Sequence, residues 1–537
     1  MERILLKKGW IIDGSGKDRF QGDVLIEGKK IKTVSSFPLS GEGARVIDCE
    51  GLVVAPGFID GHSHQDHFFA VDDPHPFFDS FLEQGITTFI CGNCGFGMAG
   101  FQKGSPYKQE IAKGFLANAL YDVEVSWDTW PEYEQIIEGQ GMLANMAKLA
   151  AHGAALGSVI GPGTPDAFAL TEQVKKEVLE ILEEGLLDGC KGISLGLAYR
   201  PGNFMTDEEI HKTAALAAEH GKLLTVHRKV ETALSGAYTD FDEAHNVRWL
   251  RSFFDIIQDT GVKVHVSHLI YPGRSTFPSY EAMHKLLETY RAAGLDVTYD
   301  MYSYEYGATE IAILLAADIP LVLDRIRTDR KYHDLREAES LKTAELAGIQ
   351  ESDVILSNPY VPELEPYKGM NFRDIAEMRG LSGFDNKLDI LERTNGHATI
   401  LLSPYYTTEM IVRQMQDPLC NYMTDAWIDP GCTQNPAAYG GMPRFLRLAR
   451  EETDMRLEDV VHKMTGKTAK RFDLGRRGLL KNGYYADITV FDPKEVSETA
   501  TPEHTQGKPK GIACVMVNGQ IVVEWGQVKD VRAGMSI

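Results

Sequence analysis

The sequence lacks any long run of apolar residues. Its first residues, Met1–Lys7, contain neither the apolar segment nor the small-residue cleavage site of a secretory signal. No later stretch approaches the roughly 20 apolar residues that a membrane-spanning helix requires. We therefore expect a cytoplasmic protein without a membrane partner.

Cysteine and basic side chains are also scarce. The seven cysteines are odd in number and scattered over 537 residues, which argues against a disulfide framework and favours buried thiols or metal ligands. The 55 basic side chains are outnumbered by 77 acidic ones, which gives a formal charge of −22. Because nucleic-acid binding depends on a basic surface, nucleic acid is not an expected partner.

The overall composition, with 43% hydrophobic and 25% charged residues, is typical of a soluble globular protein. Short apolar runs separated by Gly, Asp and Ser fill both ends of the chain, a pattern typical of β-hairpins. We therefore predict one small β-sandwich domain built from residues 1–54 and 475–537.

Between these ends, apolar runs of β type alternate with longer helical patterns, which indicates βα units and a parallel sheet. There are eight such runs, which fits an α/β fold of the (β/α)₈ TIM-barrel type over residues 55–474. They are the run before His62 and residues 87–91, 146–151, 192–195, 223–226, 262–266, 296–299 and about 422–424. Residues 307–397 are too long for a simple connection, and we predict an inserted lid subdomain; ordinary barrel helices with extra decoration are the alternative.

Potential metal ligands follow most of the predicted barrel strands. Because the carboxyl ends of barrel strands meet at one rim, these side chains are expected to converge. The set comprises His62 and His64, whose spacing places both on one side of an extended segment, with Cys94, His152, His227, His268 and Asp425. Imidazole, thiolate and carboxylate together favour Zn²⁺ over Mg²⁺ or Ca²⁺.

Asp425 carries the carboxylate that a hydrolase needs. A metal lowers the pKa of bound water, and a neighbouring carboxylate accepts the proton and passes it to a leaving amine. An Asp that only caps the next helix is the alternative.

Several segments, distributed nearly end to end, resemble the amidohydrolase superfamily and, within it, the D-aminoacylase or N-acyl-D-amino-acid deacylase family. The most specific is Gly92-Asn93-Cys94-Gly95. The others include residues 56–64, 192–202, 267–268, 300–304 and 517–519.

The resemblance implies a barrel of the amidohydrolase type and roles for several residues. Cys94, His227 and His268 would form a tight zinc site. His62, His64 and Asp425 would form a weaker second position, with Cys94 able to bridge and Asp425 as general acid/base. Tyr199 falls where the family contacts substrate, although it would also suit simple packing, and His152 would contact substrate or buttress the site.

The departures from the family concern the groups that hold a substrate carboxylate. Ile270 stands where the family usually has a lysine, and Ala437 where it often has an arginine. The usual His-x-Arg becomes His227-Arg228-Lys229, so Arg228 and Lys229 are the candidate substitutes. Arg274 and Arg444 are further candidates, and residues 302–306 supply three tyrosines for a more neutral pocket.

We therefore predict a zinc-dependent hydrolase of carbon–nitrogen amide bonds that deacylates an N-acyl-D-amino acid or a related small N-acyl compound. A hydrolase of cyclic amides, ureides or neutral amides is the alternative among enzymes. A metal-stabilised binding protein is the alternative among other classes. The number of metals and assembly into a homo-oligomer stay open.

Overall fold

A barrel of parallel strands forms the centre of the molecule, and the structure, a computed structural model, describes residues 2–114, 123–162, 170–234, 242–316, 319–501 and 504–537. Six parallel strands run in the order β17-β13-β12-β11-β10-β9, and three more in the order β6-β7-β8. Their bounds are β6 (Phe58–Asp60), β7 (Ile86–Cys91), β8 (Asn145–Lys148), β9 (Ala150–Ala151), β10 (Gly192–Gly196), β11 (Leu223–His227), β12 (Lys263–Val266), β13 (Val297–Met301) and β17 (Cys420–Tyr422).

Two short connections close this barrel. β8 and β9 are consecutive parts of one segment and join the two sheets. Opposite them, the Gly61 amide donates to the Tyr422 carbonyl at 3.3 Å, and the Asp425 amide donates to the His62 carbonyl at 3.1 Å. The predicted eight-stranded α/β barrel is thus confirmed.

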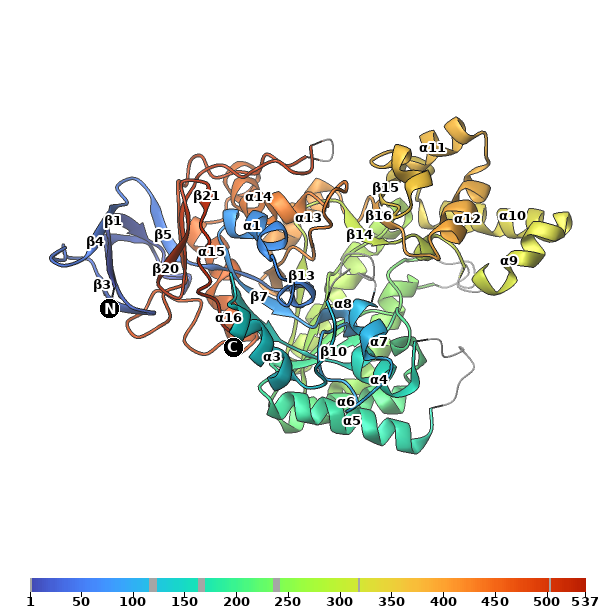
Figure 1. Ribbon diagram of the computed structural model, residues 1–537, viewed down its shortest axis with the longest axis horizontal. Coiled ribbons are helices and arrows are strands. Elements are labelled where there is room, and N and C mark those ends of the chain that lie inside the picture. The colour runs from blue at the N-terminus through green and yellow to red at the C-terminus, as the bar shows by residue number, and fades with distance from the viewer. Residues whose placement is uncertain (1, 115–122, 163–169, 235–241, 317–318, 502–503) are drawn as a thin grey trace.

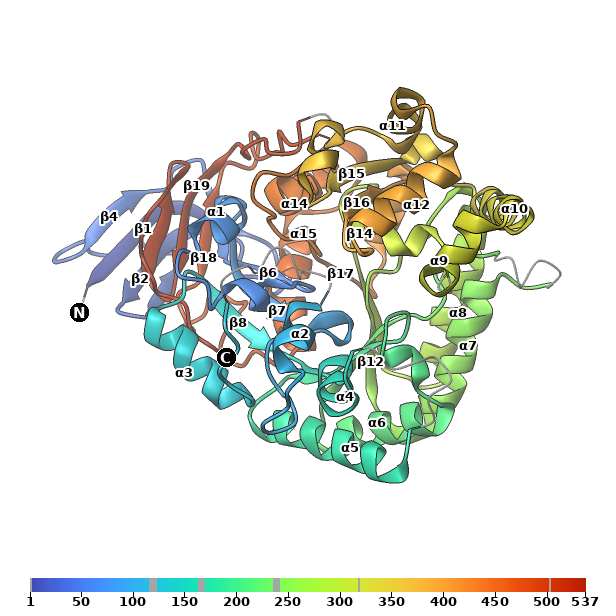
Figure 2. The ribbon, with the colours of Figure 1, turned by 45° about the vertical axis from the view of Figure 1, so that its right-hand side comes forward.

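Helices cover the outside of the barrel (Figure 2). Their bounds are α1 (His75–Glu83), α2 (Lys108–Lys113), α3 (Trp130–Gln140), α4 (His152–Ile160), α5 (Glu172–Leu187), α6 (Asp207–Glu219), α7 (His245–Ile257), α8 (Tyr280–Ala292), α13 (Thr408–Gln416), α14 (Ala437–Glu452), α15 (Leu457–Met464) and α16 (Gly466–Arg471). Helix α6 shows why such segments form: Thr206 and Glu209 make a capping box, and Ile210, Ala214 and Ala217 face the core. Among the described residues, no helix has the length and apolar character needed to cross a membrane.

Both ends of the chain contribute to a nine-stranded sheet beside the barrel. Figure 1 shows the first strands and the last strands side by side. The order is β21-β20-β19-β18-β5-β1-β2-β3, with β4 paired to β1. The bounds are β1 (Arg3–Ile11), β2 (Phe20–Glu27), β3 (Lys30–Ser35), β4 (Arg45–Asp48), β5 (Val53–Pro56), β18 (Ile488–Phe491), β19 (Ile512–Val517), β20 (Gln520–Glu524) and β21 (Gln527–Val528). A separate apolar core, which includes Leu6, Val24 and Met516, packs against it.

A third unit lies between β13 and β17 and projects from the barrel (Figures 1 and 2). Its antiparallel sheet has the order β14-β16-β15. The bounds of its elements are β14 (Gly307–Glu310), α9 (Ile319–Thr328), α10 (Arg330–Ala347), β15 (Val354–Asn358), α11 (Phe372–Arg379), α12 (Gly383–Arg393) and β16 (Thr399–Leu402). After β16 the chain returns to the barrel through Tyr405, whose carbonyl accepts from the Tyr271 amide at 3.1 Å.

Candidate metal centre

Cys94 lies in a tight turn, η2 (Asn93–Gly95), directly after β7. The turn has left-handed backbone at Gly92 and Gly95, with φ of 79° and 74°, and at Cys94 itself, with φ of 55°. A Cβ at Gly95 would lie 2.8 Å from the Gly196 amide nitrogen, so only glycine allows β10 to approach this closely. The side chain of Asn93 stabilises the turn by donating to the Ile90 carbonyl at 2.8 Å. The geometry of this turn therefore explains why the sequence Gly-Asn-Cys-Gly occurs here.

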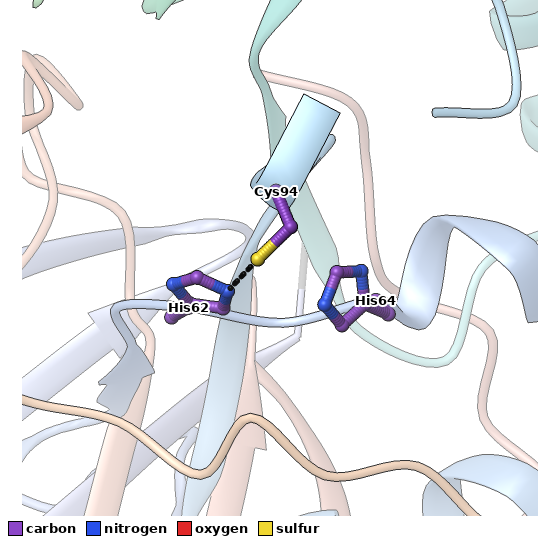
Figure 3. A group of neighbouring side chains, drawn as sticks. All are labelled: His62, His64 and Cys94. Carbon is purple, nitrogen blue, oxygen red and sulfur yellow. Dashed lines mark hydrogen bonds between the residues drawn. The ribbon is translucent and has the colours of Figure 1, made fainter. Parts of the chain in front are cut away.

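Cys94 lies close to His62 and His64, the two histidines that follow β6. Its Sγ lies 3.3 Å from His62 Nε2. Figure 3 shows the sulfur pointing to His62, with His64 farther along the same segment. His62, His64 and Cys94 together place one ligand atom each within 4.8 Å of one another.

The same sulfur also contacts the histidines at the ends of β11 and β12. Sγ lies 3.5 Å from His227 Nδ1 and 3.4 Å from His268 Nε2. Ligands at about 2.0–2.3 Å from a tetrahedral zinc ion lie roughly 3.5 Å from each other, so this spacing suits such an ion. Cys94 thus belongs to two groups of potential ligands at once.

Asp425 completes the cluster from the eighth strand. Its Oδ1 lies 3.5 Å from His62 Nε2 and 3.3 Å from His64 Nε2. Its Oδ2 accepts a hydrogen bond from the Tyr302 hydroxyl at 2.5 Å. Burial opposes ionisation of Asp425, but the neighbouring histidines outweigh burial and hold its pKa well below the usual range.

Three of the clustered residues have left-handed backbone, which is rare outside glycine: Cys94, His268 and Asp425, with φ of 55°, 32° and 44°. Such backbone strain concentrates at functional sites, where the surrounding structure maintains it.

Asp300, on β13, contacts two of the clustered histidines, His62 and His268, and also His265. Its Oδ2 accepts from His265 Nε2 at 2.9 Å and lies 3.4 Å from His62 Nδ1. Its Oδ1 accepts from the backbone amide of His268. Burial opposes ionisation, but His265 and His62 outweigh it and keep the pKa of Asp300 low. This carboxylate therefore orients potential ligands in both groups.

The donor set fits a divalent transition metal such as zinc. In the protein alone, burial raises the pKa of the Cys94 thiol to about 11, whereas a bound metal would stabilise the thiolate. Burial also lowers the pKa of His268 to about 4, so this imidazole is neutral and able to act as a ligand at pH 7. Sulfur, nitrogen and one carboxylate in a buried site match the ligands that zinc takes.

Comparison with known proteins agrees with this chemistry. The sequence profile of the amidohydrolase family matches residues 423–523. A D-aminoacylase from Alcaligenes xylosoxydans xylosoxydans is 28% identical over 523 residues, which cover 96% of this chain and 93% of the relative. The chain is therefore similar to an amidohydrolase of this kind over nearly its whole length.

Two solved structures superpose over nearly the whole chain. An N-acyl-D-glutamate deacylase from Bordetella bronchiseptica, complexed with zinc and a phosphonate mimic of the tetrahedral intermediate, has a TM-score of 0.78 at 27% identity, covering 99% of this chain and 98% of the other. A D-aminoacylase with a binuclear metal centre has a TM-score of 0.78 at 26% identity, covering 99% of both chains.

Two other predicted site residues, Tyr199 and His152, differ in their position relative to the metal centre. The Tyr199 ring lies 4.5 Å from the His227 ring and 5.0 Å from that of Phe96, beside the metal centre. His152 is buried at the start of α4, where burial lowers its pKa to about 4. It is not part of the ligand groups found among the described residues.

The candidate cations differ in their availability. Arg228 is fully buried, and its Nη2 donates to the Ile270 carbonyl at 2.9 Å and pairs with Glu231. Lys229 is exposed, and its Nζ donates to the Asn203 carbonyl at 3.1 Å.

Two more distant arginines are already engaged. Arg274 pairs with Asp353, with Nη1 and Oδ2 separated by 2.6 Å. Arg444 donates to the Ser303 carbonyl at 2.6 Å and pairs with Glu305 at 3.2 Å.

Sequence reasoning assigned no role to Asp300, His265 or Glu231. Asp300 belongs to the matched segment 300–304, which was a usable signal. His265 lies within β12 and Glu231 in the loop after β11, where no spacing rule points to them. Tyr302 was expected only to line a pocket, but it contacts Asp425 directly.

Proposed function

We propose that this protein is a zinc-dependent hydrolase that removes the acyl group from N-acyl-D-amino acids. The observation that carries the proposal is the position of Asp425, a carboxylate held between the clustered histidines and Tyr302. The similarity to a D-aminoacylase over 96% of the chain supports the substrate class.

Cys94, His227 and His268 would hold the tighter zinc ion, and His62, His64 and Asp425 a weaker one, with Cys94 shared. When bound, zinc supplies Lewis acidity toward a carbonyl oxygen and lowers the pKa of water. The chain's own residues then position and move the proton.

Asp425 is suited to accept that proton. Its low pKa keeps it ionised at neutral pH, and the Tyr302 hydroxyl fixes one carboxylate oxygen so that the other faces His62 and His64. Burial raises the pKa of Tyr302, so the tyrosine remains a hydrogen-bond donor. After the proton is transferred, the acid form of Asp425 is placed to protonate the leaving amine nitrogen.

The remaining roles belong to the same proposal. Tyr199 is supported as a substrate contact by its position against His227. Lys229 is supported as a carboxylate contact by its exposure beside the Asn203 loop. Arg228 would act through Glu231, and His152 would buttress the site from α4.

The two alternatives are less well supported. Hydrolysis of cyclic or neutral amides is not favoured, because the D-aminoacylase and the N-acyl-D-glutamate deacylase are 28% and 27% identical to this chain. The dihydropyrimidinase and hydantoinase structures that also match over the whole chain are only 15% to 17% identical. A purely structural metal site would need no additional acid/base group, whereas Asp425 lies beside the ligands.

The domain division also stays a prediction. We propose residues 1–54 and 475–537 as one β domain, residues 55–474 as the catalytic barrel, and 307–397 as a lid; residues 317–318 of that range lie outside the described ones. A cytoplasmic location is supported by seven cysteines that are all free and buried. Homo-oligomer formation stays open.

Asp425→Asn tests the proposed chemistry. Zinc-loaded enzyme should lose about 10²- to 10⁴-fold in kcat on an N-acetyl-D-amino acid, the contribution typical of general acid/base catalysis, while the tight zinc remains. Asp429→Asn is the matched control, since that buried carboxylate is bonded by Asn358 and Tyr360 instead of the histidines. Wild-type kcat in Asp425→Asn would contradict the assignment.

A further inference from the structure

Glu231 is a mostly buried carboxylate next to the metal centre. It follows β11 by four residues, and its side chain is 15% exposed. One oxygen, Oε2, pairs with the Arg228 guanidinium. The other, Oε1, lies 4.0 Å from His227 Nε2, beyond hydrogen-bond distance.

Oε1 has no hydrogen-bond partner among the residues that the structure describes. Burying a carboxylate oxygen without a partner is unfavourable, and a single arginine offsets this only in part. A second cation or hydrogen-bond donor at Oε1 would complete this arrangement.

The carboxylate lies beside a candidate metal ligand that also contacts the expected substrate residue. Glu231 Oε1 is 4.0 Å from His227 Nε2. The ring of Tyr199, the expected substrate contact, packs on the His227 ring at 4.5 Å. Glu231 and Tyr199 therefore both adjoin His227.

Arg228 fixes the orientation of Glu231. It is fully buried, and its Nη2 is held between the Ile270 carbonyl and the carboxylate. The neighbouring position 270, where the family usually has lysine, carries an apolar side chain. The paired Arg228 leaves Glu231 Oε1 without a partner, and its own Nε and Nη1 also lack hydrogen-bond partners among the described residues.

We propose that Glu231 determines specificity in the proposed deacylation, and that the preferred substrates are N-acyl-D-amino acids with a positively charged side chain, bound through Glu231 Oε1. The inference rests on the proposed function and names its substrate class. An acidic side chain, such as that of the glutamate for which the Bordetella bronchiseptica relative is named, would be repelled by Glu231.

The test compares N-acetyl-D-lysine, N-acetyl-D-leucine and N-acetyl-D-glutamate as substrates of the full-length zinc enzyme. Wild type should show the highest kcat/KM for the lysine derivative and the lowest for the glutamate derivative. Glu231→Gln should lower kcat/KM for the lysine derivative by about 10- to 100-fold, the value of one charge-assisted hydrogen bond, mainly through KM. The leucine derivative should be affected far less.

Two variants control for folding and for charge. Glu231→Asp keeps the charge and should keep the order of the three substrates. Glu305→Gln removes a comparable arginine-paired carboxylate whose oxygens are already engaged by Arg444 and Thr408, so the order should again hold. Zinc content, measured for every variant, reports whether the metal ligands remain in place.

Three results would overturn the inference. The first is an unchanged ratio of lysine to leucine activity in Glu231→Gln. The second is a uniform loss on all three substrates together with loss of zinc, which would make Glu231 a residue that positions His227. The third is a wild-type preference for the glutamate derivative.

Failure of the proposed function would look different. Wild type loaded with zinc would then hydrolyse none of the three compounds. Calorimetric titration of N-acetyl-D-lysine into metal-free protein decides in that case: binding that Glu231→Gln weakens at least tenfold supports the cation site, and no binding to wild type overturns it.

Discussion

Replacing Asp300 with Asn should weaken metal binding without removing a metal ligand. Asp300 is fully buried, contacts His62 Nδ1 and His265 Nε2 with one oxygen, and accepts the His268 amide with the other. Asparagine keeps the shape and one acceptor but loses the charge and places an NH₂ group against one of these partners. Loss of such an orienting carboxylate costs about 10- to 100-fold in metal affinity, or about 1.4 to 2.7 kcal/mol.

The assay is titration of metal-free protein with zinc against a chelator of known affinity. Because Asp300 contacts one histidine from each ligand group, both the tighter and the weaker binding step should weaken. Asp296→Asn is the matched control on the same segment, since Asp296 is 55% exposed and pairs with Arg471. Wild-type zinc affinity in Asp300→Asn would refute the view that this carboxylate positions the ligands.

Further predictions concern Cys94 and Tyr302. Cys94→Ala should lower the affinity of both metal positions together, because one sulfur belongs to both groups; loss of a single metal by elemental analysis would contradict sharing. Since the metal-free thiol has a pKa of about 11, zinc binding at pH 7 must release its proton, so affinity should rise with pH. Calorimetry in buffers of different ionisation enthalpy should show about one proton fewer released by Cys94→Ala. Tyr302→Phe should lower kcat about tenfold with little change in KM, because it frees one Asp425 oxygen; an equal change in KM would place Tyr302 in substrate binding instead.

The barrel was predictable because its strands are buried on both faces and read as continuous apolar runs. All residues of β7, β10 and β11 are buried, and β11 ends at the candidate ligand His227. The eighth strand was harder to place: it was expected near 422–424 but ends at Tyr422, because Thr424 turns to donate to buried Asp60. The domain boundaries have not been tested and stay predictions.

Much of the candidate site follows from one topological rule, that the carboxyl ends of barrel strands converge. This rule brings Cys94, His227 and Asp425 together from strands distant in sequence. It does not apply to a residue inside a strand, such as His265, or to a loop residue, such as Glu231. Their roles depend on distances that local sequence patterns do not encode.

Arg228 shows that the charge presented at the site is also hard to predict from local sequence. Arg228 directly follows His227, the last residue of β11. The sequence made Arg228 one candidate for holding a substrate carboxylate; the structure buries it and pairs its Nη2 with Glu231. The charge offered at the site depends on the whole pair, which is why substrate preference cannot be inferred from the arginine alone.

The backbone of η2 explains why one thiol can belong to two groups of ligands. Left-handed backbone at Gly92 and Cys94 turns the chain back at the end of β7, and Gly95 lets that turn approach β10, where its amide donates to Ser194 Oγ at 3.0 Å. The sulfur is thereby held 3.3 Å from His62 on one side and 3.4 to 3.5 Å from His268 and His227 on the other. A side chain at Gly95 would meet the backbone of β10 and push the turn away. The separation between the two groups of ligands is therefore determined by two glycines that bind nothing themselves.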